Sequence, residues 1–517
     1  MSPDDRSKNI EGESQLGDLL DWLRDYAARR INSQLIDERR TIAPHIVLDM
    51  GNRGLLGMQI PKEYGGRLAL TNFELLRVQR QLGAIDLTLA FFVGLNNGLG
   101  VRPILRFAQS HLKERYLPDL ASGRILGAFA VSEEGAGSNP LALAATAQRR
   151  ADGFIVSGTK LWCGSAAWAG VISVFAKHVD PDGRAAGHVG LCIDADQAGM
   201  RVGPEALTMG LRGMVQNTVH FQDAVVPLDR VLGSQFAGLS VASDVMGFGR
   251  LGIAATAVGG LWRALQLMVR YSGRRQINTG SLYAHGHTQR IINDAWRAAT
   301  LLGKFVDGIA CALDRGVSPP TELYAAAKLL ASEALWQGAD TAMQMLGGRG
   351  YCENNGSSQL LRDARITRLF EGPSETLASF IGQRMWQSKG SHLAGFFSQC
   401  GAAGQAAACS LEELLERIVD GSRSRTASDQ GHAAMLVPLG YAVAWQLVAA
   451  STDPSAPADT CWLEGQFEAA ATRAVAGLNG TGLPDSAAIA HEIAFHIGDI
   501  EQSAAGADFQ LDSYLRS

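Results

Sequence analysis

The chain has 517 residues, of which 46% are hydrophobic and 19% are charged, and its formal net charge is −5 at pH 7. This length exceeds one ordinary core and indicates about two to four packed units, and the apolar fraction excludes a disordered chain. A pI near 6.1 gives no basic footprint for nucleic acid, which favours small-molecule chemistry.

The seven cysteines are scattered without a CxxC pair, which argues against a disulfide framework or a zinc site and fits a reducing compartment. His491 and His496 are five residues apart on a predicted helix, whereas ligand pairs favour spacings of three or four, so no metal is expected. No signal segment opens the chain, and no apolar run reaches the roughly 18 residues of a transmembrane helix. We therefore expect a cytoplasmic protein without a membrane span.

The first region, residues 1–126, is predicted to be a helical domain, because apolar residues recur at helical spacing with breaks expected at 61–66 and 96–100. Residues 127–239 change to short alternating runs rich in Val, Ile, Gly and Asp, which predict a compact β-domain, a small barrel or sandwich. Its expected strands are 153–158, 170–177, 188–193 and 218–221.

Long helical patterns return in residues 240–388 and predict a four-helix bundle, with helices expected at 245–271, 287–312 and 321–346. Residues 389–517 are Ala-rich and predict a helical appendage. Its expected helices are 411–420, 433–450, 461–478 and 487–503, with a loop at 452–457. The predicted fold class is α+β.

One segment near the end of the bundle is a candidate for chemistry. Glu371 stands between Phe370 and Gly372, with Leu369 one residue earlier. Burial among apolar neighbours raises the pKa of a carboxyl group, and a general base works best when its pKa lies near the working pH. Glu371 is therefore a candidate general base, and the alternative is an ordinary surface glutamate near a helix start.

Several motifs together resemble the acyl-CoA dehydrogenase family. The segment AFAVSEEGAGSN at 128–139 is followed by DGFIVSGTKLW at 152–162. Further agreement in order and spacing comes from segments at 54–66, 209–233, 250–275 and 344–375. The likeness covers about residues 15–388, and several co-linear matches are far more specific than one glycine pattern. The appendage is similar, in architecture only, to the extra helical region of long-chain family members.

The resemblance implies an FAD enzyme that removes the α-proton and the β-hydride of an acyl thioester and leaves a trans-2-enoyl product. Glu371 stands where many members carry the base, and its backbone N–H would bind the thioester oxygen. Other members place the base directly before an arginine on an earlier helix. Here Gly249 precedes Arg250, and glycine cannot accept a proton.

The resemblance also implies the cofactor contacts. In the β-domain they are Phe129, Val131, Ser132 and Trp162. From a neighbouring subunit they are Arg275, Gln344, Gly347, Gly348 and Gly350. Gly164 stands where the family has a hydroxyl bonding flavin N5, so either Ser165 substitutes after a small shift or a backbone group serves. The alternatives are core packing for Phe129 and Trp162, and a solvated helix-end cation for Arg275.

On the substrate side, the resemblance places Ser138 near the thioester chain and Phe370 at the acyl pocket. Arg250 matches a position that addresses the CoA portion, and its alternative role is an ordinary ion-pair partner inside the bundle. Small residues at Gly94, Gly98 and Gly100 are expected to leave room for the acyl chain. The tether is either CoA or an acyl carrier protein.

Implied partners are an electron-transferring flavoprotein and further copies of the chain. We expect a homodimer, with a tetramer as the alternative, because a bulky appendage blocks one face of the usual family tetramer. Two other functions stay open at this point. One is a flavin-dependent monooxygenase on the same fold, and the other is a non-catalytic relative that acts through its C-terminal extension.

Overall fold

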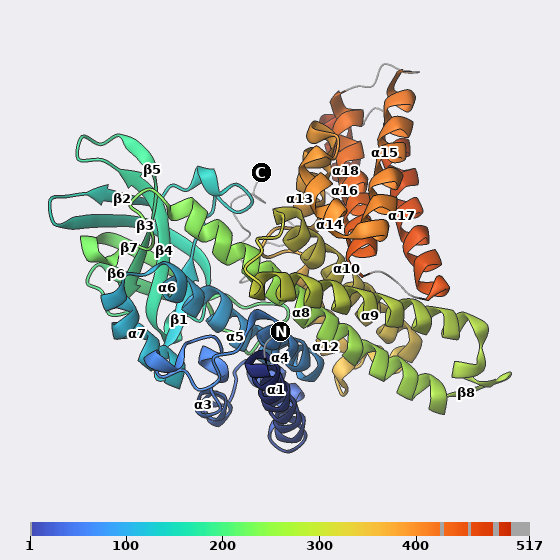
Figure 1. Cartoon of the computed structure of the whole chain (residues 1–517), viewed down its shortest axis with the longest axis horizontal. Helices are drawn as coiled ribbons and strands as arrows, with labels where there is room; N and C mark the ends of the chain where they lie inside the picture. Colours follow the sequence, from blue (N-terminus) through green and yellow to red (C-terminus); the bar gives the residue numbers. More distant parts are fainter. Residues whose placement is uncertain (1–2, 424–428, 453–455, 479–484, 498–517) are drawn as a thin grey trace.

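The computed structural model describes residues 3–423, 429–452, 456–478 and 485–497. Figure 1 shows the β-domain on the left, the C-terminal helices at the upper right, and the long helix α8 running between the two sides. The α+β fold class is confirmed. One hydrophobic core joins the N-terminal helices, the bundle and the appendage. A second joins the β-domain to the helices α6, α7 and α8, and a third lies within the β-domain.

The N-terminal region is helical, as predicted. Its elements are α1 (Pro3–Arg30), α2 (Ser33–Arg39), α3 (Pro44–Asn52), η1 (Leu55–Gly57), η2 (Lys62–Tyr64), α4 (Asn72–Ile85), α5 (Leu87–Leu95), η3 (Asn96–Val101), α6 (Arg102–Phe107) and α7 (Ser110–Ser122). Helix α4 begins with a capping box, because the Thr71 side chain accepts from the Glu74 N–H while the Glu74 carboxylate accepts from the Thr71 N–H.

The break expected at 96–100 is wrong. Residues Asn96–Val101 form a π-helical segment that joins α5 to α6 without interruption. Two buried amides hold this wider turn. Asn97 donates to the carbonyls of Leu55 and Val93 and accepts from the Met58 N–H. Asn96 likewise fixes the segment to the β-domain, because its Oδ1 accepts from the N–H of Gly127. The side-chain hydrogen bonds of these two asparagines therefore hold the segment in a helix despite its glycines.

The β-domain holds a seven-stranded sheet in the order β1-β4-β2-β3-β7-β6, with β5 paired to β4. Its strands are β1 (Leu126–Ala130), β2 (Thr146–Arg149), β3 (Gly153–Gly164), β4 (Ala169–Val179), β5 (Ala185–Asp194), β6 (Met200–Glu205) and β7 (Gln216–Pro227). The four predicted strands are confirmed as parts of β3, β4, β5 and β7. The register of β3 against β7 shifts between Lys160 and Cys163, and Trp162 there has a φ of 55°.

The bundle follows the β-domain, and its three predicted helices are confirmed. Its elements are η6 (Leu228–Arg230), α8 (Gly238–Arg274), the hairpin of β8 (Gln276–Ile277) and β9 (Gly280–Ser281), η7 (Leu282–Ala284), α9 (Gly286–Asp314), α10 (Thr321–Leu346), α11 (Gly348–Tyr351), α12 (Gly356–Thr367) and α13 (Ser374–Ser388). Helix α8 packs against α10 and α4. Gly83 allows the second contact, since a Cβ there would stand 2.3 Å from the carbonyl of Thr256.

The appendage packs directly on the bundle. Its elements are η8 (Ser391–Leu393), α14 (Ala394–Gln399), α15 (Gly401–Arg423), α16 (Asp429–Thr452), α17 (Pro457–Gly477) and α18 (Ser486–Ile497). Glycines bring α16 against α13, because a Cβ on Gly440 would stand 1.8 Å from the Ala378 carbonyl and one on Gly382 would stand 2.0 Å from the Leu436 carbonyl. The predicted appendage helices are confirmed where they are described, and residues 498–503 of the last one lie outside the described part.

Two of the described helices are long and apolar enough to cross a membrane by length and composition, namely α8 and residues 431–452 of α16. In the fold, 67% of the apolar window of α8 and 56% of that of α16 are buried. Helix α8 is covered by α4 and α10, and α16 by α13 and α17. This is the packing of core helices in a globular protein.

Candidate active site

The turn that carries Glu371 links α12 to α13, and hydrogen bonds join its first and last residues. The Ser374 N–H donates to the Arg368 carbonyl across 3.0 Å. Glu333 of α10 then joins the two ends, because its Oε1 accepts from Arg368 Nε at 2.7 Å and from Ser374 Oγ at 2.6 Å. The loop between these residues is therefore anchored to the bundle.

Two cations hold the middle of the turn by its carbonyls. Arg250 Nε of α8 donates to the Glu371 carbonyl at 3.0 Å, and Lys328 Nζ of α10 donates to the Gly372 carbonyl at 2.6 Å. Glu371 has a φ of 52°, a conformation that few non-glycine residues adopt. Such backbone strain costs about 1 to 3 kcal/mol and persists only where the surroundings impose it. The two donors and the Glu333 bridge supply that constraint.

The Glu371 side chain points into the protein. Its Oε2 is buried and has no hydrogen-bond partner among the described residues, although the residue as a whole is only half-buried. Burial raises the pKa of Glu371, while the positive charges of Arg250 and Lys328 oppose that rise. Burial also lowers the pKa of Lys328 to about 7, with further lowering from Arg250. The alternative of a solvated surface glutamate does not describe this carboxylate.

A narrow apolar cavity lies beside this turn. Its walls come from α4, α5, η3 and α8, and its free volume of about 20 Å³ is close to that of one water molecule. Its lining residues are Leu75, Gln79, Phe91, Gly94, Leu95, Gly98, Leu99, Phe248, Gly249, Gly252, Ile253 and Thr256. Phe370 reaches this wall, because its ring packs edge-on against that of Phe91 with centroids 5.2 Å apart. The arginine neighbour of Glu371 directly follows the lining residue Gly249.

Gly98 lines the cavity and has open space around it, in agreement with the room expected there. Gly94 also lines the cavity, but a Cβ there would stand 2.4 Å from Nε2 of Gln79, and Gly100 does not appear in the wall. A Cβ on Gly100 would stand 2.5 Å from the carbonyl of Gly127. The small residue at 100 therefore lets the π-helical segment approach β1, and the expectation that it leaves room for a ligand is wrong.

The far end of the cavity meets the β-domain. Leu95 lines the cavity, and its Cδ1 lies 3.8 Å from the position of a Cβ on Gly164, at the end of β3. Nearby, Trp168 packs edge-on against Phe92 of α5, with ring centroids 6.1 Å apart. Leu95, a wall residue of the cavity, therefore lies close to the strand end where the flavin edge is expected.

The residues expected to contact FAD within the β-domain gather at one edge of it. The Leu161 N–H donates to the Ser132 carbonyl at 2.9 Å, which joins the end of β3 to the segment after β1. The Trp162 side chain is 62% exposed, so its indole face is open to a ligand. Val131 is buried, and the Phe129 ring packs with Phe175 at 5.0 Å.

The surroundings of Gly164 and Ser165 bear on which group could bond flavin N5, where the family has a hydroxyl. Ser165 is buried with a φ of 60°, and its N–H donates to the Val215 carbonyl at 2.8 Å. That N–H is therefore committed within the β-domain. A Cβ on Gly164 would stand 3.4 Å from Nε2 of Gln216, so a side-chain amide of β7 occupies the neighbourhood of the missing hydroxyl.

The second group of expected FAD contacts belongs to another part of the fold. Arg275 caps the C-terminal end of α8 before the β8–β9 hairpin, far from the β-domain in Figure 1. Gln344 is exposed in the last turn of α10, where Gly347 and Gly348 have open space around them. Gly350 instead packs under α10, because a Cβ there would stand 2.6 Å from the Met343 carbonyl.

The remaining candidates are Ser138 and Arg250. Ser138 is exposed in the loop between β1 and β2. Arg250 makes no ion pair with a carboxylate in the described residues and binds the Glu371 carbonyl instead. Sequence reasoning missed Lys328 and Glu333, for which the available signal was a charged residue on the apolar pattern of α10.

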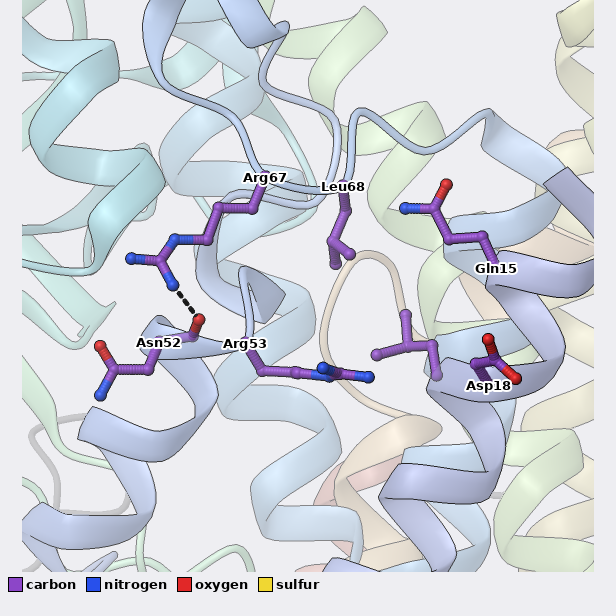
Figure 2. Close-up of a pocket in the computed structure, with 7 residues that line it drawn as sticks. Gln15, Asp18, Asn52, Arg53, Arg67 and Leu68 are labelled. Carbon is purple, nitrogen blue, oxygen red and sulfur yellow. Dashed lines mark hydrogen bonds between the residues drawn. The ribbon is translucent and has the colours of Figure 1, made fainter. Parts of the chain in front are cut away.

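A larger surface hollow of about 520 Å³ lies elsewhere, between α1 and the end of α3. Figure 2 shows Arg67 donating to the Asn52 carbonyl. The Arg53 guanidinium lies 5.2 Å from the centre of the Trp22 ring. The hollow is open to solvent and its lining contains no residue of the Glu371 turn, so we do not assign the chemistry to it.

The comparison with known proteins agrees with this geometry. Family models for the N-terminal, middle and C-terminal domains of acyl-CoA dehydrogenases match residues 15–124, 128–224 and 237–386. The human mitochondrial short-chain specific acyl-CoA dehydrogenase is 31% identical over 72% of this chain and 90% of its own length. An acyl-CoA dehydrogenase of Bacillus subtilis is 30% identical over 68% of this chain and 93% of its own length.

Two further comparisons concern length. The very long-chain specific enzyme of Bos taurus is 29% identical over 66% of this chain, and the chain covers 53% of that entire protein, about half its length. The solved acyl-CoA dehydrogenase of Bacillus anthracis in complex with FAD has a TM-score of 0.76 at 20% identity and covers 93% of this chain and 90% of its own, so its fold extends over most of the appendage. By its domain matches and its relatives, this chain belongs to the acyl-CoA dehydrogenase family.

Proposed function

We propose that this protein is an FAD-dependent acyl thioester dehydrogenase that converts an acyl-CoA, or an acyl group on a carrier protein, to the trans-2-enoyl thioester. Glu371 is the proposed base for the α-proton. The observation that carries the proposal is the buried Oε2 of Glu371, which has no hydrogen-bond partner among the described residues and whose turn contacts the wall of a small apolar cavity through the Phe370 ring. Family members are oxidoreductases that act on CH–CH groups, which supports the same reaction type.

The residues of the turn suit proton abstraction. A carboxylate in an apolar setting is a stronger base than one in water, because burial raises its pKa. The positive charges of Arg250 and Lys328 oppose that rise in the pKa of Glu371 and favour its ionised form. A positioned general base contributes about 10²- to 10⁴-fold in rate. We assign the binding of the thioester oxygen to the Glu371 backbone N–H, where a preorganised donor stabilises the developing negative charge.

Family membership indicates FAD as the cofactor, and the residues present fit it. Trp162 offers an open indole face, and Ser132 lies next to it at the same edge. The backbone at Gly347 and Gly348 is open to close approach by a second copy of the chain, because a Cβ at either position would meet nothing within 4 Å. When bound, the flavin supplies an acceptor for the β-hydride. Trp162 and Ser132 would hold that ring, and the apolar side chains around the Glu371 turn would exclude water from the site.

The proposal includes the partners. The electron acceptor is an electron-transferring flavoprotein, and the active form is a homodimer, or else a tetramer, in which Arg275 and Gln344 of one copy complete the FAD site of another. The protein is proposed to work in the cytoplasm. Figure 1 shows β8, which directly follows Arg275, on the opposite side of the chain from the β-domain that carries Trp162, and this placement supports a shared site.

Anaerobic titration of the FAD-loaded protein with butyryl-CoA, octanoyl-CoA and palmitoyl-CoA, and with the matching carrier-bound thioesters, tests the proposal. We expect at least one of them to bleach the flavin. Glu371→Gln should retain the yellow colour and slow bleaching by about 10²-fold or more, since it removes the base. Glu412→Gln changes an exposed glutamate of α15 in the same way and should bleach normally.

Full activity of Glu371→Gln would place the base elsewhere. Absence of bleaching by every thioester, together with oxygen-dependent turnover, would replace the proposal with the monooxygenase alternative. Purified protein that carries no flavin at all would favour the non-catalytic relative.

A further inference from the structure

Lys328 is the one lysine that contacts the Glu371 turn among the described residues. Its side chain is completely buried within α10, and its ammonium group donates to the Gly372 carbonyl at 2.6 Å. A buried ammonium group is costly unless it meets a negative charge or several acceptors. An apolar residue at position 328 would therefore be expected to give a more stable fold than lysine does.

The arrangement around Lys328 explains that position. The Gly372 carbonyl directly follows the residue that Arg250 holds, so α8 and α10 bind two consecutive carbonyls of the same turn. The Glu371 carboxylate feels the charge of both cations. Gly372 itself has a φ of 98°, so its carbonyl direction depends on a conformation that glycine favours.

We propose that Lys328 is a positioning residue for the base, which holds the Glu371–Gly372 turn through the Gly372 carbonyl and places a positive charge near the Glu371 carboxylate. This inference rests on the proposed function of Glu371. It adds a second element, α10, to the control of the base, so that the rate of proton abstraction depends on a side chain that never touches the substrate.

The charged groups that face Lys328 come from three helices. Arg250 of α8 repels it, whereas Glu333 of α10, Glu375 of α13 and Glu371 itself attract it. Loss of the Lys328 charge removes an attraction from Glu371, so the acid limb of the pH profile should move upward. An opposite charge within about 4 to 6 Å shifts a carboxyl pKa by about 1 to 3 units, and a partly ionised lysine sits at the low end of that range.

The test is the single-turnover rate of flavin bleaching between about pH 6 and pH 9 in the FAD-loaded full chain. The substrate is whichever of butyryl-CoA, octanoyl-CoA and palmitoyl-CoA bleaches the wild type fastest. Lys328→Met should move the acid limb about one pH unit higher, so its rate deficit is about tenfold at low pH and shrinks at high pH. Lys328→Arg retains a cation and a donor and should restore the wild-type limb.

Lys304→Met is the matched control, because Lys304 is exposed on α9 of the same bundle. It should leave the limb in place. A Lys328→Met variant that loses thermal stability but keeps the wild-type limb would show a purely structural role and overturn the inference. An upward limb in Lys328→Arg would overturn it too, even if Lys328→Met fails to fold. Glu371→Gln separates the two proposals. Full activity of Glu371→Gln would refute Glu371 as the base. An inactive Glu371→Gln together with an unchanged acid limb in Lys328→Met would refute only the role of Lys328.

Discussion

We predict that the buried carboxyl group of Asp363 in α12 makes the free energy of unfolding depend on pH, and that Asp363→Asn abolishes this dependence. Its carboxyl group is buried, and its Oδ1 accepts from the Leu211 N–H at 2.6 Å, which ties the loop before β7 to the bundle. Burial, helped by the negative charge of Asp86, raises the pKa of Asp363 to about 8. The unfolded chain would hold the same group near its ordinary value of about 4.

The sign follows from proton binding. Between about pH 4 and pH 8 the folded protein holds a proton on Asp363 that the unfolded chain releases, so stability falls as pH rises and levels off above the folded pKa. The slope for one group is at most about 1.4 kcal/mol per pH unit. For a chain of this length that unfolds as one unit, this equals about 1 °C per pH unit in the thermal midpoint.

Asp363→Asn keeps an acceptor for the Leu211 N–H and replaces the protonated acid by a neutral amide. The variant and the wild type should therefore have similar thermal midpoints near pH 5, and the variant should gain about 1 °C over the wild type with each pH unit up to about pH 8. Asp340→Asn, at an exposed position on α10, is the control and should show no such gain. A difference that stays constant with pH, or that grows on acidification, would refute the reasoning.

Two other substitutions test the packing. Gly440→Val should destabilise the docked appendage by about 3 kcal/mol, because its side chain would overlap the Ala378 carbonyl. Gly465→Val, on the open face of α17, is the control and should cost nothing, because valine has a slightly higher helix propensity than glycine. Limited proteolysis and thermal unfolding measure both, and equal losses would contradict the close contact. Lys160→Met should lower the free energy of unfolding by about 3 to 5 kcal/mol, because it leaves Glu133 buried in the β-domain without its cation. Thermal unfolding and the flavin content after purification measure the effect. An unchanged thermal midpoint would contradict a structural ion pair.

The sequence predicted the parts of the fold that depend on local pattern. The long helices and four of the strands have strong periodicity, so their existence was predictable. The short strands β1, β2 and β6 were missed, because four to six residues carry little periodicity and because part of the pairing joins strands that are far apart in the sequence. For example, β1 forms a parallel ladder with β4, with Phe129 opposite Ser173. The break expected at 96–100 failed for a related reason, since Asn97 binds residues about forty positions away.

The candidate site shows the same division. The resemblance and the local sequence around Glu371 predicted a base there, and the buried carboxylate is consistent with it. The positive φ of Glu371 and the grip of Lys328 were not predictable, because each needs helices that are far apart in the sequence to meet around one turn. Tertiary contacts, and not local propensity, set the conformation of that turn.

The shape of the cavity wall depends on how many residues form the widened turn at Asn96–Val101. A π-helical turn accommodates one more residue than an α-helical turn. Removing a single residue there would narrow this turn to a regular α-helical one and redistribute its side chains around the helix axis. Leu99 would then lose its place in the wall, while the helix from Arg102 would still face Asp244. Insertions and deletions, more than substitutions, are therefore the changes that this stretch can least absorb.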